Sequence, residues 1–170
     1  MAKGDAALLG SKESQVDMKT LMYAGAAAAI AFLGLGALQM SAGAPFDYAG
    51  ASEKRQQTIL DEMAAALQYG LVRATGGAIS VRNASGDASR DTVSLFGQYL
   101  DRRYESATEE QVEVVREGLF SNICNQQGTR RAIDDGVAIR FAIARPSGAP
   151  LLDIQFDLDS CAPFMRASVG

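Results

Sequence analysis

The hydrophobic pattern of the chain is dominated by one uninterrupted apolar stretch, residues 20–40. This stretch contains no charged side chain, and its two strongly polar residues, Thr20 and Gln39, lie at its ends. At about 1.5 Å per residue, a helix of this length is about 31 Å long, which matches the hydrocarbon thickness of a bilayer. The pattern therefore predicts a single membrane-spanning helix, which we place at residues 18–40.

Two other interpretations of this stretch compete with a membrane span. A cleaved secretory signal also has an apolar run, and residues 42–44 have the small-residue pattern of a cleavage site. However, the run is longer than the usual signal core of about 7 to 15 residues, and Pro45 follows where the bond would be cut. A buried helix of a soluble domain is rarely apolar on every face in so small a chain. We therefore prefer the membrane span.

Small side chains recur along the predicted span at helical spacing. Because small residues let helices approach closely in lipid, they predict an interface with other integral membrane protein subunits. The alternative is that alanine and glycine are simply common in such helices, since one small-residue motif is weak evidence. The residues of this predicted helix-packing interface are Ala24, Gly25, Ala28, Ala29, Gly36 and Ala37.

The segments on either side of the span have the composition of flexible chain. Residues 1–17 mix charges with glycine and serine and are predicted to form a cytoplasmic N-terminal segment. Residues 41–51 are predicted to be a linker from their Gly, Pro and Ser content. Phe46 and Tyr48 lie within this linker, where aromatic side chains at the outer membrane surface are expected.

Residues 52–170 are predicted to form a small domain beyond the membrane, and its first element is a helix at residues 52–75. In this segment Ile59, Met63, Leu67 and Leu71 recur every fourth residue. Ser52 is a suitable N-cap, and two glycines at 76–77 end the helix. A short strand at residues 79–81 and a loop at residues 83–90 are predicted to follow.

Two further helices are predicted in the middle of the domain. Val93, Phe96, Leu100 and Tyr104 indicate one helix at residues 91–104. A similar spacing of apolar residues at 112, 115, 119 and 120 indicates another. The spacings of Ser106 with Glu109 and of Thr108 with Gln111 are both typical of a capping box before this second helix. A helical turn at residues 129–134 is predicted to stop at Gly136.

A β-hairpin is the most distinct feature of the C-terminal part. Apolar residues alternate at odd positions from Val137 to Ile143 and at even positions from Leu152 to Leu158. With residues 147–150 as a four-residue loop, Ile143 would face Ile154, Phe141 would face Phe156, and Arg140 would face Asp157. The apolar face of the hairpin must be covered by the helices, which predicts an α+β domain. The expected fold class is thus a single-pass membrane protein with about three helices, a short strand and a C-terminal hairpin outside the cytoplasm.

The cysteines, Cys124 and Cys161, both follow the span. In a small domain facing an oxidising compartment such a pair forms a disulfide, although two reduced, buried thiols in a cytosolic domain are the alternative. Lys3, Lys12 and Lys19 precede the span, which slightly favours a cytoplasmic N-terminus. We therefore expect the domain to lie in the periplasm and the span to lie in the inner membrane if the source is bacterial.

Composition excludes several functions. A net charge of -4 argues against nucleic-acid binding, and the absence of histidine removes the commonest general base and many metal sites. The acidic residues Asp134 and Asp135 are more typical of a helix end, and residues 157–160 lack the glycine and glutamate of a calcium loop. The sequence therefore predicts no enzyme, no cofactor and no metal site.

Two functional hypotheses follow for a membrane-tethered, non-catalytic protein. The first is an accessory or assembly subunit of a larger bacterial inner-membrane complex, with the lipid bilayer and other integral membrane subunits as partners. The alternative is a free-standing periplasmic ligand-binding or sensor domain. These hypotheses differ in whether a partner or a ligand pocket is required.

Overall fold

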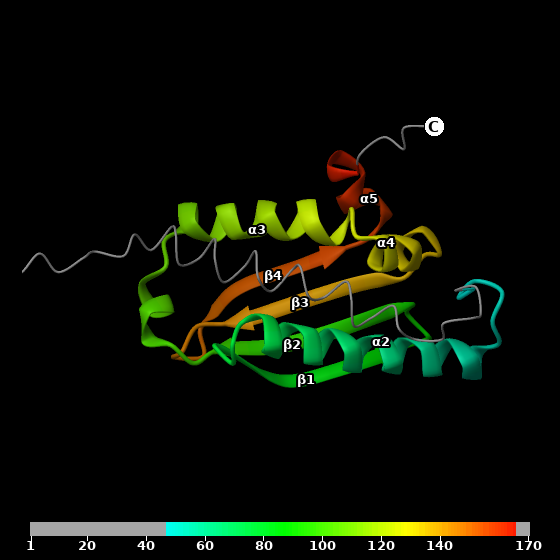
Figure 1. Ribbon diagram of the computed structural model, residues 1–170, viewed down its shortest axis with the longest axis horizontal. Helices are drawn as coiled ribbons and strands as arrows, with labels where there is room; N and C mark the ends of the chain where they lie inside the picture. The colour runs from blue at the N-terminus through cyan, green and yellow to red at the C-terminus, as the bar shows by residue number, and fades with distance from the viewer. Residues whose placement is uncertain (1–46, 166–170) are drawn as a thin grey trace, which may run out of the picture.

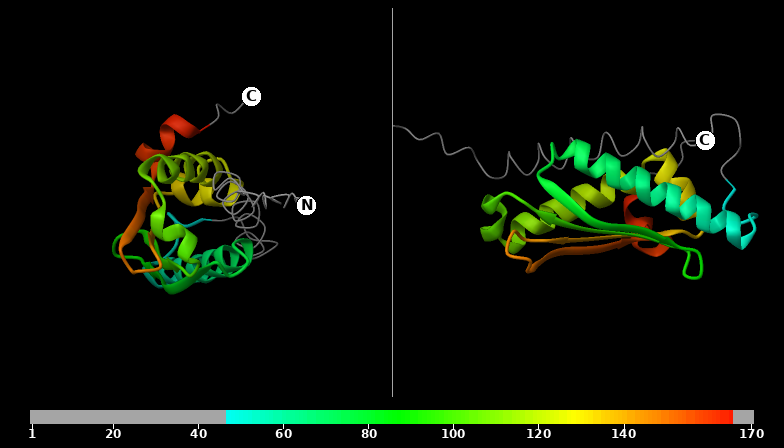
Figure 2. Two further views of the ribbon diagram at one scale, coloured as in Figure 1. Left: turned by 90° about the vertical axis from the view of Figure 1, so that its left-hand side faces the viewer. Right: turned by 90° about the horizontal axis from the view of Figure 1, so that it is seen from below.

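The computed structural model describes residues 47–165, which form a small α+β domain with a four-stranded sheet. Figure 1 shows helices α2 and α3 running along the sheet, and the turned views of Figure 2 place both helices on the same side of it. In chain order the elements are α2 (Glu53–Ala74), β1 (Ile79–Asp87), β2 (Thr92–Tyr99), the 3-10 helix η1 (Arg102–Ser106), α3 (Glu109–Ile123), α4 (Gln127–Asp134), β3 (Ala138–Ala144), β4 (Pro150–Phe156), α5 (Leu158–Cys161) and the 3-10 helix η2 (Ala162–Phe164).

The four strands lie in the order β1-β2-β3-β4. The β1–β2 and β3–β4 pairs are antiparallel, whereas β2 and β3 are parallel. A parallel pair needs a long crossover connection, and here η1, α3 and α4 form it. The crossover places α3 over the β4 side of the sheet, while α2 packs against β1 and β2.

The hydrophobic core lies between the sheet and these helices. The strand registers place buried apolar residues in rows across the sheet, so that Ile139 lies opposite both Val93 and Phe156. The next row has Leu95, Phe141 and Ile154, all of which are also buried. Removing such rows from water is the main favourable contribution to folding.

The predicted first helix is confirmed as α2. Its repeated apolar residues, including Met63 and Leu67, are buried against the sheet. The contact is unusually close at Gly86 of β1, where an added Cβ atom would lie 2.4 Å from Cβ of Leu60. Glycine at this position therefore lets the helix backbone approach the strand.

The helix predicted at residues 91–104 is wrong, because most of this segment is β2. Val93, Leu95 and Gly97 point towards the helices and are buried. Phe96 lies between them in the alternation and therefore points to the other face of the sheet. The predicted loop at residues 83–90 is also wrong in large part, since β1 continues to Asp87 and pairs with β2 along its length.

The predicted hairpin is present as β3 and β4, but its predicted register is wrong by two residues. Ile143 pairs with Leu152 and Phe141 with Ile154, so the odd and even apolar sets still share the inner face. The shift follows from the turn, where Gly148 has φ 91 and its N–H donates to the carbonyl of Arg145. These contacts close a tighter connection than the loop expected at residues 147–150.

The register shift changes the partners of Arg140 as well. This residue lies opposite Gln155 rather than Asp157. Its guanidinium forms an ion pair with Asp153, with Nη2 and Oδ2 at 2.6 Å. Both side chains are substantially exposed on the outer face, so the pair is expected to contribute little to stability.

The third predicted helix is confirmed as α3. Thr108 and Gln111 form the reciprocal capping box at the start of α3. The competing capping box of Ser106 with Glu109 does not match the structure, because Ser106 is the last residue of η1. The predicted helical turn is α4, and Gly136 after it has φ 94, in the region that favours glycine.

Within residues 47–165, no helix is both long and apolar enough to cross a membrane. The predicted span at residues 18–40 lies outside the described residues.

Candidate functional site

The structure contains the predicted disulfide between Cys124 and Cys161. Cys124 is the C-cap of α3 and Cys161 ends α5, and both are fully buried. Beside the bond, the ring of Phe120 on α3 stacks on that of Phe164 with centroids 4.8 Å apart. The disulfide and this aromatic contact together hold the chain after β4 against α3.

The acidic residues after β4 cap a helix. The carboxylate of Asp157 accepts a hydrogen bond from the backbone N–H of Ser160, and the hydroxyl of Ser160 accepts one from the N–H of Asp157. The bond from the Ser160 N–H contributes most to lowering the pKa of Asp157. The carboxylate of Asp157 therefore caps the start of α5. No group of three or more potential metal ligands occurs among residues 47–165.

The other acidic pair also has structural partners. Asp134 forms an ion pair with Arg130 one turn earlier in α4, at 3.3 Å. Asp135 is the C-cap of α4, and its carboxylate accepts a hydrogen bond from the backbone N–H of Tyr48 at 3.1 Å. Both carboxylates thus stabilise the end of α4 and its neighbourhood.

The expected position of Tyr48 at a membrane surface is wrong, because only 2% of this residue is exposed. Its hydroxyl donates to Oδ1 of Asp91 at 2.6 Å, and its carbonyl accepts from Nε2 of Gln56 at 3.2 Å. Burial and the bond to Asp91 raise the pKa of Tyr48 well above its usual value. The folded domain therefore includes the end of the predicted linker at residues 41–51.

The other predicted site residues lie outside the described part of the chain. They are the second predicted surface aromatic, Phe46, and the predicted helix-packing residues Ala24, Gly25, Ala28, Ala29, Gly36 and Ala37.

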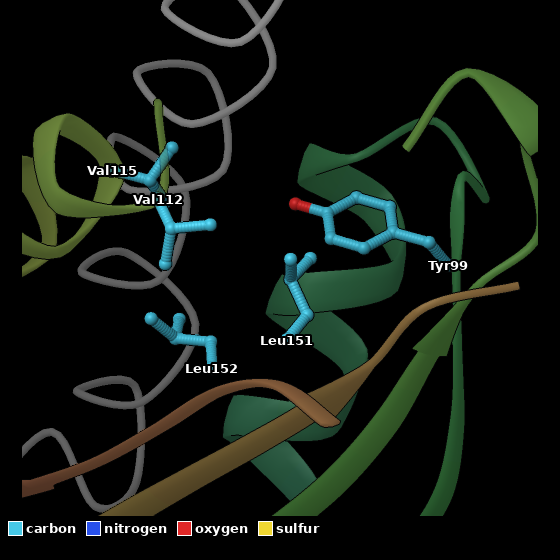
Figure 3. Close-up of a pocket in the computed structure, with 5 residues that line it drawn as sticks. All are labelled: Tyr99, Val112, Val115, Leu151 and Leu152. Atoms are coloured by element: carbon cyan, nitrogen blue, oxygen red, sulfur yellow. The ribbon is translucent and has the colours of Figure 1, made fainter. Parts of the chain in front are cut away.

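An apolar pocket lies between α3 and the sheet (Figure 3). Val112 and Val115 line it from α3, Leu151 and Leu152 from β4, and Tyr99 from the end of β2. Figure 3 shows the two valines pointing across the space towards the side of Tyr99 and Leu151. The pocket encloses about 250 Å³ when the space open to solvent at its mouth is included.

Among residues 47–165, no charged side chain lines this pocket. Tyr99 carries the titratable group of this described lining, and its ring stacks on Tyr104 with centroids 3.9 Å apart. Burial, together with the nearby Tyr104, raises the pKa of Tyr99 to about 12. The described lining is therefore uncharged at physiological pH and suits an apolar occupant.

The pairing of β3 with β4 explains why two consecutive leucines line the pocket. Successive residues of a regular strand point to opposite faces. Here the register shifts after Ile143, so that Ala144 pairs with Pro150 and Leu151 is left without an opposite residue. The alternation of the sequence indicated only Leu152 as an inward residue, and it contains no signal for this bulge.

The wall of the pocket is held by contacts between η1 and the β3–β4 turn. The guanidinium of Arg145 donates to the carbonyl of Glu105 at 2.7 Å and to that of Ala107 at 3.1 Å. In return, the carboxylate of Glu105 accepts bonds from the hydroxyl and the N–H of Ser147, which lower its pKa. These bonds fix the segment that carries Tyr104, the stacking partner of Tyr99.

Comparison with known proteins identifies a similar fold and no family. No family model and no curated protein matches the chain. A putative secreted protein from Pseudomonas aeruginosa has a similar structure, with a TM-score of 0.50 and 19% identity over 66% of this chain and 99% of that one. At this identity the similarity shows the fold alone.

Two pilotins of type 2 secretion systems are also among the similar structures. The Vibrio vulnificus pilotin EpsS has a TM-score of 0.49 and 22% identity, over 64% of this chain and 94% of its own. The Vibrio cholerae pilotin AspS has a TM-score of 0.43 and 21% identity, over 65% of this chain and 100% of its own.

Proposed function

We propose that this protein is a non-catalytic accessory or assembly subunit of a larger bacterial inner-membrane complex. In this proposal residues 18–40 anchor it, and the domain at residues 47–165 binds a partner protein in the periplasm. The observation that carries the proposal is the uncharged pocket between α3 and the sheet. The described part of its lining offers apolar contacts and no charged group, which suits the recognition of an apolar protein surface.

The size of the pocket favours this function over the ligand-binding alternative. Small-molecule sites usually enclose about 300 to 1,000 Å³ and combine apolar walls with several polar groups. The pocket at α3 is small by this standard, and among the described residues the hydroxyl of Tyr99 is the polar side-chain group in its lining. The pocket therefore offers an apolar surface against which a side chain of a partner would pack.

The disulfide supports the proposed location of the domain. Bonds between cysteines persist in oxidising compartments such as the periplasm. The Cys124–Cys161 bond therefore agrees with an N-terminus in the cytoplasm and a domain on the other side of the inner membrane. The lysines before residue 20 favour the same orientation.

Purification of the full chain from membranes in mild detergent, followed by mass spectrometry, tests the proposal. The wild-type chain should retain partner proteins, and Leu151→Asp should reduce their recovery about tenfold or more, because a charge would be buried in the pocket. Leu158→Asp is the matched control, since Leu158 is 48% exposed, lies outside the pocket lining and begins α5, where an acidic residue is tolerated.

Two results would contradict the proposed function. One is a wild-type chain that migrates alone as a stable monomer. The other is equal recovery of partners with Leu151→Asp and Leu158→Asp, because the pocket would then have no part in binding.

A further inference from the structure

The position of the pocket relative to the first described residues suggests an occupant from the same chain. Tyr48 is fixed close to the start of α2 through the bond from Gln56. Tyr99 of the pocket pairs with Ile79, which follows the other end of α2. The pocket therefore lies about one length of α2 away from the point where the chain enters the domain.

The lengths of the preceding segments match this distance. α2 has 22 residues and is therefore about 33 Å long. A helix at residues 20–40 would be about 31 Å long, and residues 41–46 could span up to about 20 Å. If the chain reverses direction before Tyr48, the apolar stretch can run back beside the sheet and bring its first residues to the pocket.

The composition of residues 20–40 also suits a protein surface. Alanine contributes little to insertion into lipid compared with leucine, isoleucine or phenylalanine. Its small side chain instead allows close packing against another element. The apolar pocket would therefore be a suitable site for an alanine-rich stretch of the same chain.

We propose that the pocket lined by Tyr99, Val112, Val115, Leu151 and Leu152 docks the apolar stretch at residues 20–40 of the same chain when this stretch is outside a bilayer. Docking would shield both apolar surfaces from water. If the proposed function is correct, a consequence follows that rests on it: partner binding at the pocket would require the stretch to leave, which couples binding to membrane insertion.

Site-specific photo-crosslinking of the full chain tests the docking. The chain is made by cell-free synthesis without lipid or detergent, with the photoreactive residue p-benzoylphenylalanine replacing Val112. After irradiation, peptide mapping should find Val112 linked to residues 20–40, in a product with the mass of one chain. The same photoreactive residue at Ser121, which is exposed on α3, should give no such link.

A second variant separates docking from a general effect on folding. Leu151→Asp should lower the yield of the link from position 112 about tenfold or more, whereas Leu158→Asp should leave it unchanged. Links found only between two chains, or none to residues 20–40, would overturn the proposal. This crosslinking experiment needs no partner protein. A failure of the docking proposal can therefore be told apart from a failure of the proposed function, which is tested by co-purification.

Discussion

The hydroxyl of Tyr48 donates a hydrogen bond of 2.6 Å to the carboxylate of Asp91, which lies 43 residues further along the chain. The bond joins the segment before α2 to the residue before β2. Asp91 has φ 49, in a region that few non-glycine residues adopt. A segment that looks like linker in the sequence is therefore part of the packed domain, and its removal should be measurable.

Replacement of Tyr48 tests this contribution. Tyr48→Phe removes the bond and should lower the free energy of unfolding by about 1 kcal/mol, whereas Tyr48→Ala also removes the buried ring and should cost about 3 to 5 kcal/mol. Denaturant unfolding followed by circular dichroism measures both. Tyr69→Phe is the control, because Tyr69 is 63% exposed and should change little. If Tyr48→Ala were as stable as the wild type, the segment would not belong to the core.

The disulfide closes a sequence separation of 37 residues. By the loop-closure estimate, its removal should lower the free energy of unfolding by about 4 kcal/mol. Reduction of the wild type and the double variant Cys124→Ser, Cys161→Ser should give similar losses in denaturant unfolding. Reductant should have no effect on the double variant. Unchanged stability of the reduced wild type would show that burial around α5 suffices without the bond.

Replacing Gly86 with alanine tests the contact of α2 with β1, and the same change at Gly118 is the control. Gly86→Ala would place Cβ 2.4 Å from Cβ of Leu60 and 2.7 Å from its backbone carbon, so it should destabilise the domain by about 2 kcal/mol or more. Gly118→Ala in α3 meets nothing within 4 Å and should stabilise the helix by up to about 1 kcal/mol. Thermal unfolding of both variants should therefore shift in opposite directions. Shifts of the same sign would contradict the close helix–strand contact.

Alkaline pH should destabilise the domain through Tyr99. Its pKa is raised from 10.0 to about 12 by burial, so the unfolded chain loses the proton first as pH rises. The stabilising contribution is complete below about pH 10 and is lost as pH rises towards 12, at up to about 1.4 kcal/mol per pH unit for one proton. Unfolding measured between pH 9 and about pH 12 should show a shallower decline for Tyr99→Phe. A decline of equal slope would assign the effect to other groups.

The elements that could be predicted from the sequence depend on contacts close along the chain. α2 and α3 are amphipathic over several turns, and the capping box of Thr108 with Gln111 lies within four residues. The disulfide could be predicted from the number of cysteines. The hairpin could be recognised because apolar residues alternate through both β3 and β4.

The errors occurred where side chains depend on distant neighbours. In β2, the inward position after Leu95 is Gly97, whose missing side chain leaves room for Ile79; an added Cβ would lie 3.0 Å from Cγ2 of that residue. The alternation of apolar residues in β2 is therefore interrupted, and the spacing of the apolar residues that remain resembles that of a helix. The register of the hairpin likewise depends on a turn and a bulge that hydrophobicity does not encode.

The sequence by itself determined that a long apolar stretch precedes a small α+β domain with two helices, a hairpin and a cysteine pair, because periodicity and capping are local properties. Only the tertiary structure decided that Tyr48 is a core residue, that β2 and β3 are parallel, and that Leu151 joins Leu152 at the pocket. These features arise when segments far apart in the chain pack together in one core. Their positions therefore follow from packing and strand register.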